Sequence, residues 1–149
     1  MGSGADEVDQ RGFTLLELVV VLFVIALAAG LAAPTVGRST DSLKVRGEIA
    51  GFSAVLRHAR EQAITTRRTH RVVVDATGHQ VRVFAGDELR RTRAIPERWT
   101  IQAAGNTGLA IRFEPHGGST GADYRIAVND VTWRITVDPM TGRVRSARE

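Results

Sequence analysis

The hydrophobic pattern of the chain begins with an apolar stretch from Phe13 to Ala33 that shows no polar face. It holds about 21 residues and one charge, Glu17. With a rise of 1.5 Å per residue, a helix of this length would measure about 31 Å, enough to cross the hydrocarbon core of a bilayer. A chain of 149 residues has no core large enough to surround a helix that is apolar on all sides. We therefore predict a transmembrane helix over residues 13–35.

Glu17 is the unusual residue of this stretch. A charge inside a membrane helix costs about 2.5–3.5 kcal/mol on insertion scales, so such a residue usually has a partner and a function. No other residue of the stretch supplies a positive charge. A free α-amino group four residues upstream would supply it if the chain were cut between Gly12 and Phe13. That amine could belong to the same chain or to a neighbour in an assembly.

A second helical pattern follows the apolar stretch, and it has one apolar face. The apolar positions recur at spacings of three and four: Val45, Ile49, Phe52, Leu56, Ala59 and Ala63. This spacing predicts an amphipathic helix over residues 38–66, which begins near a cluster of capping residues at 39–41. Its polar residues Glu48, Arg57, Arg60 and Glu61 are expected to face water. Pro34 disfavours helix at the preceding residue and is predicted to kink the chain between the two helices.

From residue 71 the hydrophobic period changes to two, which is typical of β-strands. We expect strands over residues 71–75, 80–84, 88–93, 99–103, 109–113, 124–128, 132–137 and 143–145. The clearest hairpin turns at Asn129-Asp130, and residues 138–142 form the last turn. Strands at this spacing indicate an antiparallel sheet or a small sandwich packed on the helix. Residues 67–149 are thus predicted to form a β-rich globular domain, which makes the chain an α+β protein.

Composition and charge narrow the class of protein only in part. Charged residues make up 24% and apolar residues 43%, which is typical of a globular domain, and there is no cysteine to form disulfides or cysteine zinc sites. The net charge is +4; residues 1–12 contribute −2, so the chain without them would carry +6. A basic surface is compatible with nucleic acid, anionic lipid or acidic protein partners and does not choose among them.

The residues whose side chains could take part in a reaction give no sign of catalysis. The glycines of Gly117-Gly118-Ser119-Thr120-Gly121 lack the lysine and helix N-terminus of a phosphate-binding loop, and favour a turn that needs positive φ. The four histidines form no metal-like pair with a carboxylate at helical spacing: His58, His70, His79 and His116. We expect no nucleophile elbow, because a strand and not a helix is predicted to follow the loop at residues 117–121. We expect no catalytic residue, no metal and no cofactor, so the chain is not expected to be an enzyme.

The motif Gly12-Phe13-Thr14-Leu15-Leu16-Glu17 resembles the cleavage and assembly motif of type IV pilins and type II secretion pseudopilins. The resemblance implies that residues 1–12 are a leader, that a prepilin peptidase cuts between Gly12 and Phe13, and that Phe13 is N-methylated. It also implies that Glu17 pairs with the Phe13 amine of an adjacent subunit. Pro34 stands where many of these proteins carry a proline.

The same resemblance implies a fold, a location and partners. The fold would be pilin-like, with a long N-terminal helix packed on an antiparallel β-sheet domain. The chain would cross the inner membrane once, in contact with its lipid, and place the C-terminal domain in the periplasm. Its partners would be the prepilin peptidase and the other pseudopilins, major and minor, of a filament.

Later stretches narrow the resemblance. Residues 56–63, 111–121 and 138–144 are similar to the H-type minor pseudopilins (GspH) and to the related minor type IV pilins FimT and FimU. This implies a minor pseudopilin, a structural subunit of the periplasmic pseudopilus of a type II protein secretion system.

Two alternatives remain open at the level of sequence. Gly142-Arg143-Val144-Arg145 has the Gly-Arg-x-Arg form associated with FimT-type minor pilins that bind DNA during natural transformation. On a strand, Arg143 and Arg145 would point to one face and could bind successive phosphates, although such a pair is usually a solvated face. DNA is a partner only in this alternative. In the other alternative, the chain is a plain signal-anchored periplasmic domain and is not cut at Gly12.

Overall fold

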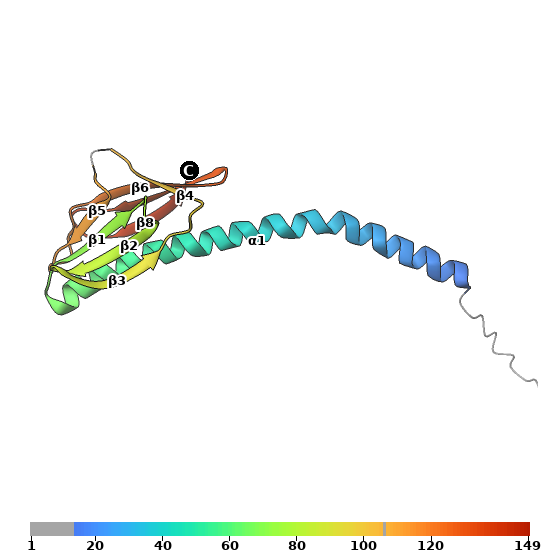
Figure 1. Ribbon diagram of the computed structural model, residues 1–149, viewed down its shortest axis with the longest axis horizontal. Helices are drawn as coiled ribbons and strands as arrows, with labels where there is room; N and C mark the ends of the chain where they lie inside the picture. Colours follow the sequence, from blue (N-terminus) through green and yellow to red (C-terminus); the bar gives the residue numbers. More distant parts are fainter. Residues whose placement is uncertain (1–13, 106) are drawn as a thin grey trace, which may run out of the picture. The chain divides into compact units, whose positions relative to one another are not determined.

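The computed structural model of the chain describes residues 14–105 and 107–149, and for residues 31–40 it describes the secondary structure only. One helix, α1, spans Leu15–Thr66, and strands follow it to the end of the chain (Figure 1). The strands are β1 His70–Asp75, β2 Gln80–Ala85, β3 Glu88–Ala94, β4 Trp99–Ala103, β5 Ala110–Phe113, β6 Ala122–Val128, β7 Val131–Val137 and β8 Val144–Arg148. The chain divides into two units after Ser42, and each unit is described by itself.

Helix α1 covers both helical segments that the sequence predicts, and it ends at Thr66 as expected. The predicted start of a separate helix at residues 39–41 is wrong, because the helix continues through them. A proline removes one backbone hydrogen bond from a helix and need not end it. The kink at Pro34 and the roles given to the two parts of α1, transmembrane over residues 13–35 and amphipathic over residues 38–66, stay predictions.

The strands form two sheets of four strands each. The strand order is β3-β2-β1-β5 in the first sheet and β4-β6-β7-β8 in the second, and neighbouring strands are antiparallel. The β6–β7 hairpin closes at the pair Val128 and Val131, and Asn129 takes a φ of +53°, which asparagine tolerates better than most residues. The strands expected from the alternating pattern are all present, but the last one begins after Arg143 and not at it.

The core of the second unit lies between α1 and the two sheets, which Figure 1 shows gathered at the C-terminal end of the helix. The predicted apolar face is confirmed: Ile49, Phe52, Leu56, Ala59 and Ala63 are buried, and Val45 is packed at the margin. Phe52 makes edge-to-face contacts with the rings of Trp99 and Tyr124, with centroids 6.2 and 5.9 Å apart. Such contacts add to the free energy gained by burying the rings.

Two polar residues of α1 differ from the prediction that they face water. Glu48 is half-buried, and its carboxylate accepts hydrogen bonds from the guanidinium of Arg98 at 2.6 Å and from the indole of Trp99 at 3.3 Å. Arg60 is also half-buried. Both stand at the margin of the buried face, where a long side chain reaches across to residues of the β domain. Arg57 and Glu61 are exposed, as expected.

Tyr124 offers a test of this core. Its hydroxyl is buried and has no hydrogen-bond partner among the described residues, and burial raises the pKa of this phenol far above its ordinary value. Removal of an unsatisfied buried polar group should cost nothing, so Tyr124→Phe should leave the free energy of unfolding unchanged or raise it by up to about 1 kcal/mol.

The measurement is urea unfolding of the full chain in detergent. Phe52→Ala, which removes both ring contacts, should lose about 3–5 kcal/mol and serves as the contrasting variant. A loss of more than about 1 kcal/mol in Tyr124→Phe would show that the hydroxyl does have a partner.

Candidate functional site

The N-terminal motif is partly visible at the start of α1. Thr14 caps the helix: its Oγ1 accepts a hydrogen bond from the backbone N–H of Glu17 at 3.2 Å, and its carbonyl oxygen accepts one from the N–H of Leu18 at 3.2 Å. A threonine followed three residues later by glutamate is the spacing of a capping box. The carboxylate of Glu17 stands in the first turn, where the helix dipole favours negative charge. This cap was not among the sequence predictions, although the Thr-x-x-Glu spacing is its signal.

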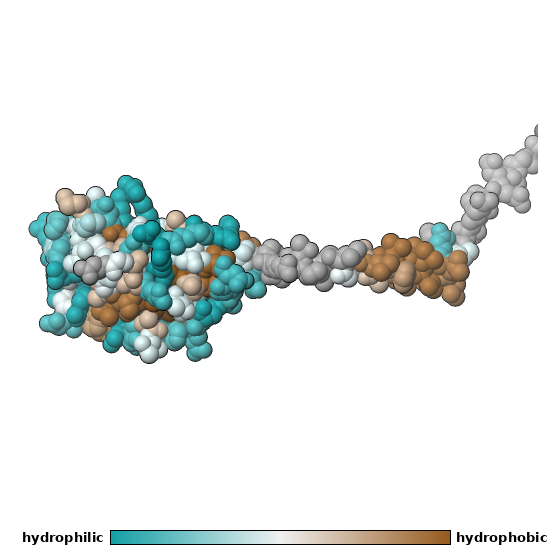
Figure 2. Space-filling model, turned by 90° about the horizontal axis from the view of Figure 1, so that it is seen from above, coloured by the Kyte–Doolittle hydropathy of each residue, from teal (hydrophilic) through white to brown (hydrophobic). Residues whose placement is uncertain are grey.

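Large apolar side chains cover the described part of this first unit on every side. From Leu15 to Leu27 they are between 46% and 81% exposed, and Figure 2 shows them as a nearly continuous apolar surface. An exposed apolar surface of this extent marks a contact with lipid or with other proteins. Among the described residues, no helix meets the length and hydropathy needed to cross a membrane. The predicted span runs beyond the described side chains at both ends, so it stays a prediction.

Several of the predicted site residues lie outside the described residues. These are Gly12 and Phe13. For Pro34, the structure describes only that it is helical. Among the described residues, no cation pairs with the carboxylate of Glu17. Cleavage after Gly12, methylation of Phe13 and pairing of Glu17 with the Phe13 amine therefore stay predictions.

At the other end of α1, Arg60 connects the helix to two turns of the β domain. Its Nε donates hydrogen bonds to the carbonyl oxygens of Gly117, at 3.1 Å, and of Thr141, at 2.9 Å. Gly142 has a φ of +63°, and a Cβ built there would collide with the Gly117 carbonyl oxygen and lie 2.9 Å from Cδ of Arg60. Only glycine fits at this position. Gly117 and Gly121 of the glycine-rich loop also have positive φ, as expected.

The turn that contains Thr141 is organised by Asp138. Its Oδ1 accepts hydrogen bonds from the backbone N–H and the hydroxyl of Thr141, at 2.8 and 3.0 Å. These bonds, the backbone one first, lower the pKa of the Asp138 carboxyl below its ordinary value of 3.8. The N–H of Asp138 donates to the carbonyl oxygen of Arg143 at 3.0 Å. Residues 138–143 thus close on themselves as a turn, which explains why Arg143 precedes strand β8.

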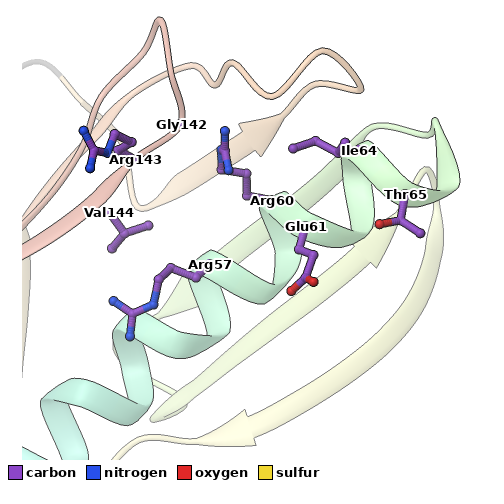
Figure 3. A pocket seen from close by; sticks show the side chains of 8 residues that line it. All are labelled: Arg57, Arg60, Glu61, Ile64, Thr65, Gly142, Arg143 and Val144. Atoms are coloured by element: carbon purple, nitrogen blue, oxygen red, sulfur yellow. The ribbon is translucent and has the colours of Figure 1, made fainter.

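The structure places the two arginines proposed to contact DNA in different elements. Arg143 lines a pocket of about 580 Å³ together with Arg57 and Arg60 of the helix (Figure 3). Arg145 lies in β8, opposite Thr136 of β7, and does not line this pocket. The prediction that the two arginines share one strand is wrong, because the turn ends between them. Their contact with DNA stays a prediction.

The buried histidine, His70, contacts the protein backbone. His70 is 4% exposed, and its Nδ1 lies 2.9 Å from the carbonyl oxygen of Arg68. Within residues 14–105 and 107–149, no three His, Cys, Asp or Glu side chains converge as metal ligands would.

The comparison with protein families decides the identity. The model described as Type II transport protein GspH matches residues 48–142, which include the Arg60 contacts and the Asp138 turn. The chain belongs to the GspH family. A second model, for the prokaryotic N-terminal methylation motif, matches residues 9–33. As a GspH protein, the chain is a minor pseudopilin of a type II protein secretion system, and such a protein is a structural subunit.

Curated relatives agree with this assignment. Type II secretion system protein H of Xanthomonas campestris pv. campestris is 34% identical over 140 residues, which are 91% of this chain and 82% of that protein. The protein of the same name from Escherichia coli is 31% identical over 108 residues, which are 72% of this chain and 52% of its relative. These relatives favour the secretion system over the FimT/FimU-like alternative. Membership in the family implies assembly with other pseudopilins and processing by a prepilin peptidase.

Solved structures confirm the predicted pilin-like α+β fold. The minor type IV pilin FimU of Pseudomonas aeruginosa aligns with a TM-score of 0.61 at 16% identity, over 72% of this chain and 91% of FimU. The minor pseudopilin EpsH of the Vibrio cholerae type 2 secretion system aligns with a TM-score of 0.54 at 16% identity, over 66% of this chain and 92% of EpsH.

The Arg60 contacts predict a measurable contribution to stability. Arg60→Ala should lower the free energy of unfolding by about 1–3 kcal/mol, because it removes charged hydrogen bonds to two backbone carbonyls. Arg57→Ala is the matched control on the same helix and should change stability by no more than about 0.5 kcal/mol. Equal effects of the two substitutions in urea unfolding would contradict the role given to Arg60.

The Asp138 turn predicts a dependence of stability on pH. A carboxyl whose pKa is lower in the folded state stabilises the fold above its unfolded pKa, near 3.8, and loses this contribution as pH falls through the folded value. Asp138→Asn keeps an oxygen acceptor for Thr141 but does not titrate, so its unfolding free energy should fall less steeply below about pH 4 than that of the wild type. The check is urea unfolding between pH 2 and pH 7; identical slopes would exclude this linkage.

Proposed function

We propose that the first unit of the chain anchors it in the inner membrane, with the β domain in the periplasm, and later packs in the core of a short pseudopilus. The observation that carries this proposal is the exposed apolar surface from Leu15 to Leu27, which holds one carboxylate beside the helix cap. A single chain buries little of this surface. Lipid before assembly and the helices of neighbouring subunits after assembly would both cover it.

The order of events follows from the N-terminal motif. Prepilin peptidase would cut between Gly12 and Phe13, and methylation of the new Phe13 amine would follow. The carboxylate of Glu17 would then pair with the Phe13 amine of a neighbouring subunit and fix the axial register of the helices, which is the best-attested use of a buried ion pair. The cap formed by Thr14 supports this proposal, because it fixes the turn from which the Glu17 side chain departs.

We infer that the protein is a filament subunit without catalytic activity and needs neither cofactor nor metal. The support is its family, whose members are structural subunits. DNA binding through Arg143 and Arg145 belongs to the natural-transformation alternative, which the curated relatives do not favour.

Substitution of Glu17 tests the proposed function. Glu17→Ala should leave membrane insertion and leader removal intact and should lower incorporation of the chain into pseudopili at least about tenfold, because the register-fixing pair is lost. Incorporation is measured as the fraction of the chain found in sheared filaments from secreting cells.

Gly12→Val is the control for processing. It should block the cut after residue 12, so the chain should keep its full length in the membrane. Normal incorporation of Glu17→Ala would remove the role proposed for the carboxylate, and a normally shortened product from Gly12→Val would remove the proposed cleavage site.

A further inference from the structure

The pocket between the last turns of α1 and the start of β8 carries an excess of positive charge. Three of its lining residues are arginines, Arg57, Arg60 and Arg143, and one is acidic, Glu61. We call the surface formed by the three arginines with Ile64 and Val144 the arginine corner. Figure 3 shows Val144 drawn between the side chains of Arg57 and Arg143, while Arg60 extends toward the turn at Gly142.

The arginines of the corner differ in what they bind. Arg60 is occupied, because its Nε serves the carbonyl oxygens of Gly117 and Thr141. The guanidinium groups of Arg57 and Arg143 have no hydrogen-bond or ion-pair partner within the described part of the chain. Elsewhere in the domain, Arg98, Arg112 and Arg134 each lie within 2.8 Å of a carboxylate oxygen. Arg57 and Arg143 are therefore free to bind an anion from outside.

The backbone beneath these guanidinium groups is fixed before any partner arrives. Arg57 belongs to a buried turn of α1, next to the fully buried Leu56. Arg143 is the last residue of the turn that Asp138 closes, and Gly142 packs directly on Arg60. A surface whose backbone is already ordered loses less conformational entropy on binding.

Apolar side chains at the corner indicate that the partner is a protein. Ile64, which is 40% exposed, and Val144 line the pocket. Met140, on the adjoining turn, is 83% exposed. Arginine and methionine beside apolar surface are characteristic of protein interfaces, whereas a phosphate backbone would gain nothing from the apolar side chains. Carboxylates, like phosphates, accept paired hydrogen bonds from guanidinium groups.

We propose that the arginine corner binds an acidic segment of another pseudopilin subunit. In this complex, Asp or Glu carboxylates of the partner pair with Arg57 and Arg143, and an adjacent apolar side chain packs on Ile64 and Val144. The inference rests on the proposed function, because it takes the partner from the same filament.

The test uses the full chain in secreting cells that also produce the other pseudopilins. A photo-crosslinking residue replaces Thr65, which is exposed and lines the pocket (Thr65→p-benzoyl-Phe). Ultraviolet light should link the chain to another pseudopilin at a peptide that contains at least two Asp or Glu residues. Arg57→Glu/Arg143→Glu should reduce this product at least about tenfold, because both charged pairs with the partner are lost. Arg91→Glu/Arg148→Glu reverses two other exposed arginines and should leave the product unchanged.

Each other outcome overturns the proposal. It fails if no crosslinked pseudopilin forms, if the product survives reversal of Arg57 and Arg143, or if the linked peptide is not acidic. It also fails if the purified full chain binds duplex DNA in a salt-sensitive way and loses this binding in the same double variant, since the corner would then be a nucleic-acid site. Leader removal and filament incorporation, measured in the same cells, distinguish these failures from a failure of the proposed function.

Discussion

The β domain depends on one buried face of α1. Its two sheets each have an apolar surface, and neither sheet could keep that surface from water without a third element. The helix supplies this element from Ile49 to Ala63, with Phe52 placed against rings of the second sheet. Ala59 and Ala63 of the same helix face are buried as well. The sequence of this half of α1 is thus constrained by the shape of the core.

The first half of the same helix has a different constraint. Its large apolar side chains from Leu15 to Leu27 are exposed, and an apolar surface of this kind marks a contact with lipid or other proteins. In the proposed function the surroundings of this surface change from lipid to neighbouring helices, which are equally apolar, so the change yields little hydrophobic free energy. Specificity must then come from a polar contact, and Glu17 is the one charge that the stretch offers. A weakly driven transfer combined with one specific pair suits a filament that assembles from subunits already in the membrane.

Local patterns predicted most of the fold because they reflect burial. Alternation of apolar and polar residues located the strands, and the spacing of Ile49, Phe52 and Leu56 located the buried helix face. The sequence did not predict that Glu48 and Arg60 turn toward the domain. Their partners lie about 50 to 80 residues away, and no local pattern encodes such contacts.

The candidate sites also combine local features, which a sequence pattern can predict, with contacts between distant segments, which it cannot. The Thr-x-x-Glu cap is local and could have been predicted. Arg143 was placed in a strand because valine follows it, but the hydrogen bonds of Asp138 hold it in the preceding turn. Only the folded chain could show that Arg143 lines the same pocket as Arg57. The grouping of strands into two sheets likewise depends on pairings between distant segments.

The contacts of Arg60 have a mechanical consequence. In the proposed function, load on the outer domain of a filament subunit has to reach the helix that packs in the filament core. Arg60 bonds the helix directly to the turns at Gly117 and Thr141, which are 57 and 81 residues further along the chain. Force applied at the end of the domain can therefore pass into α1 through a single side chain, without first stretching the loops between the strands.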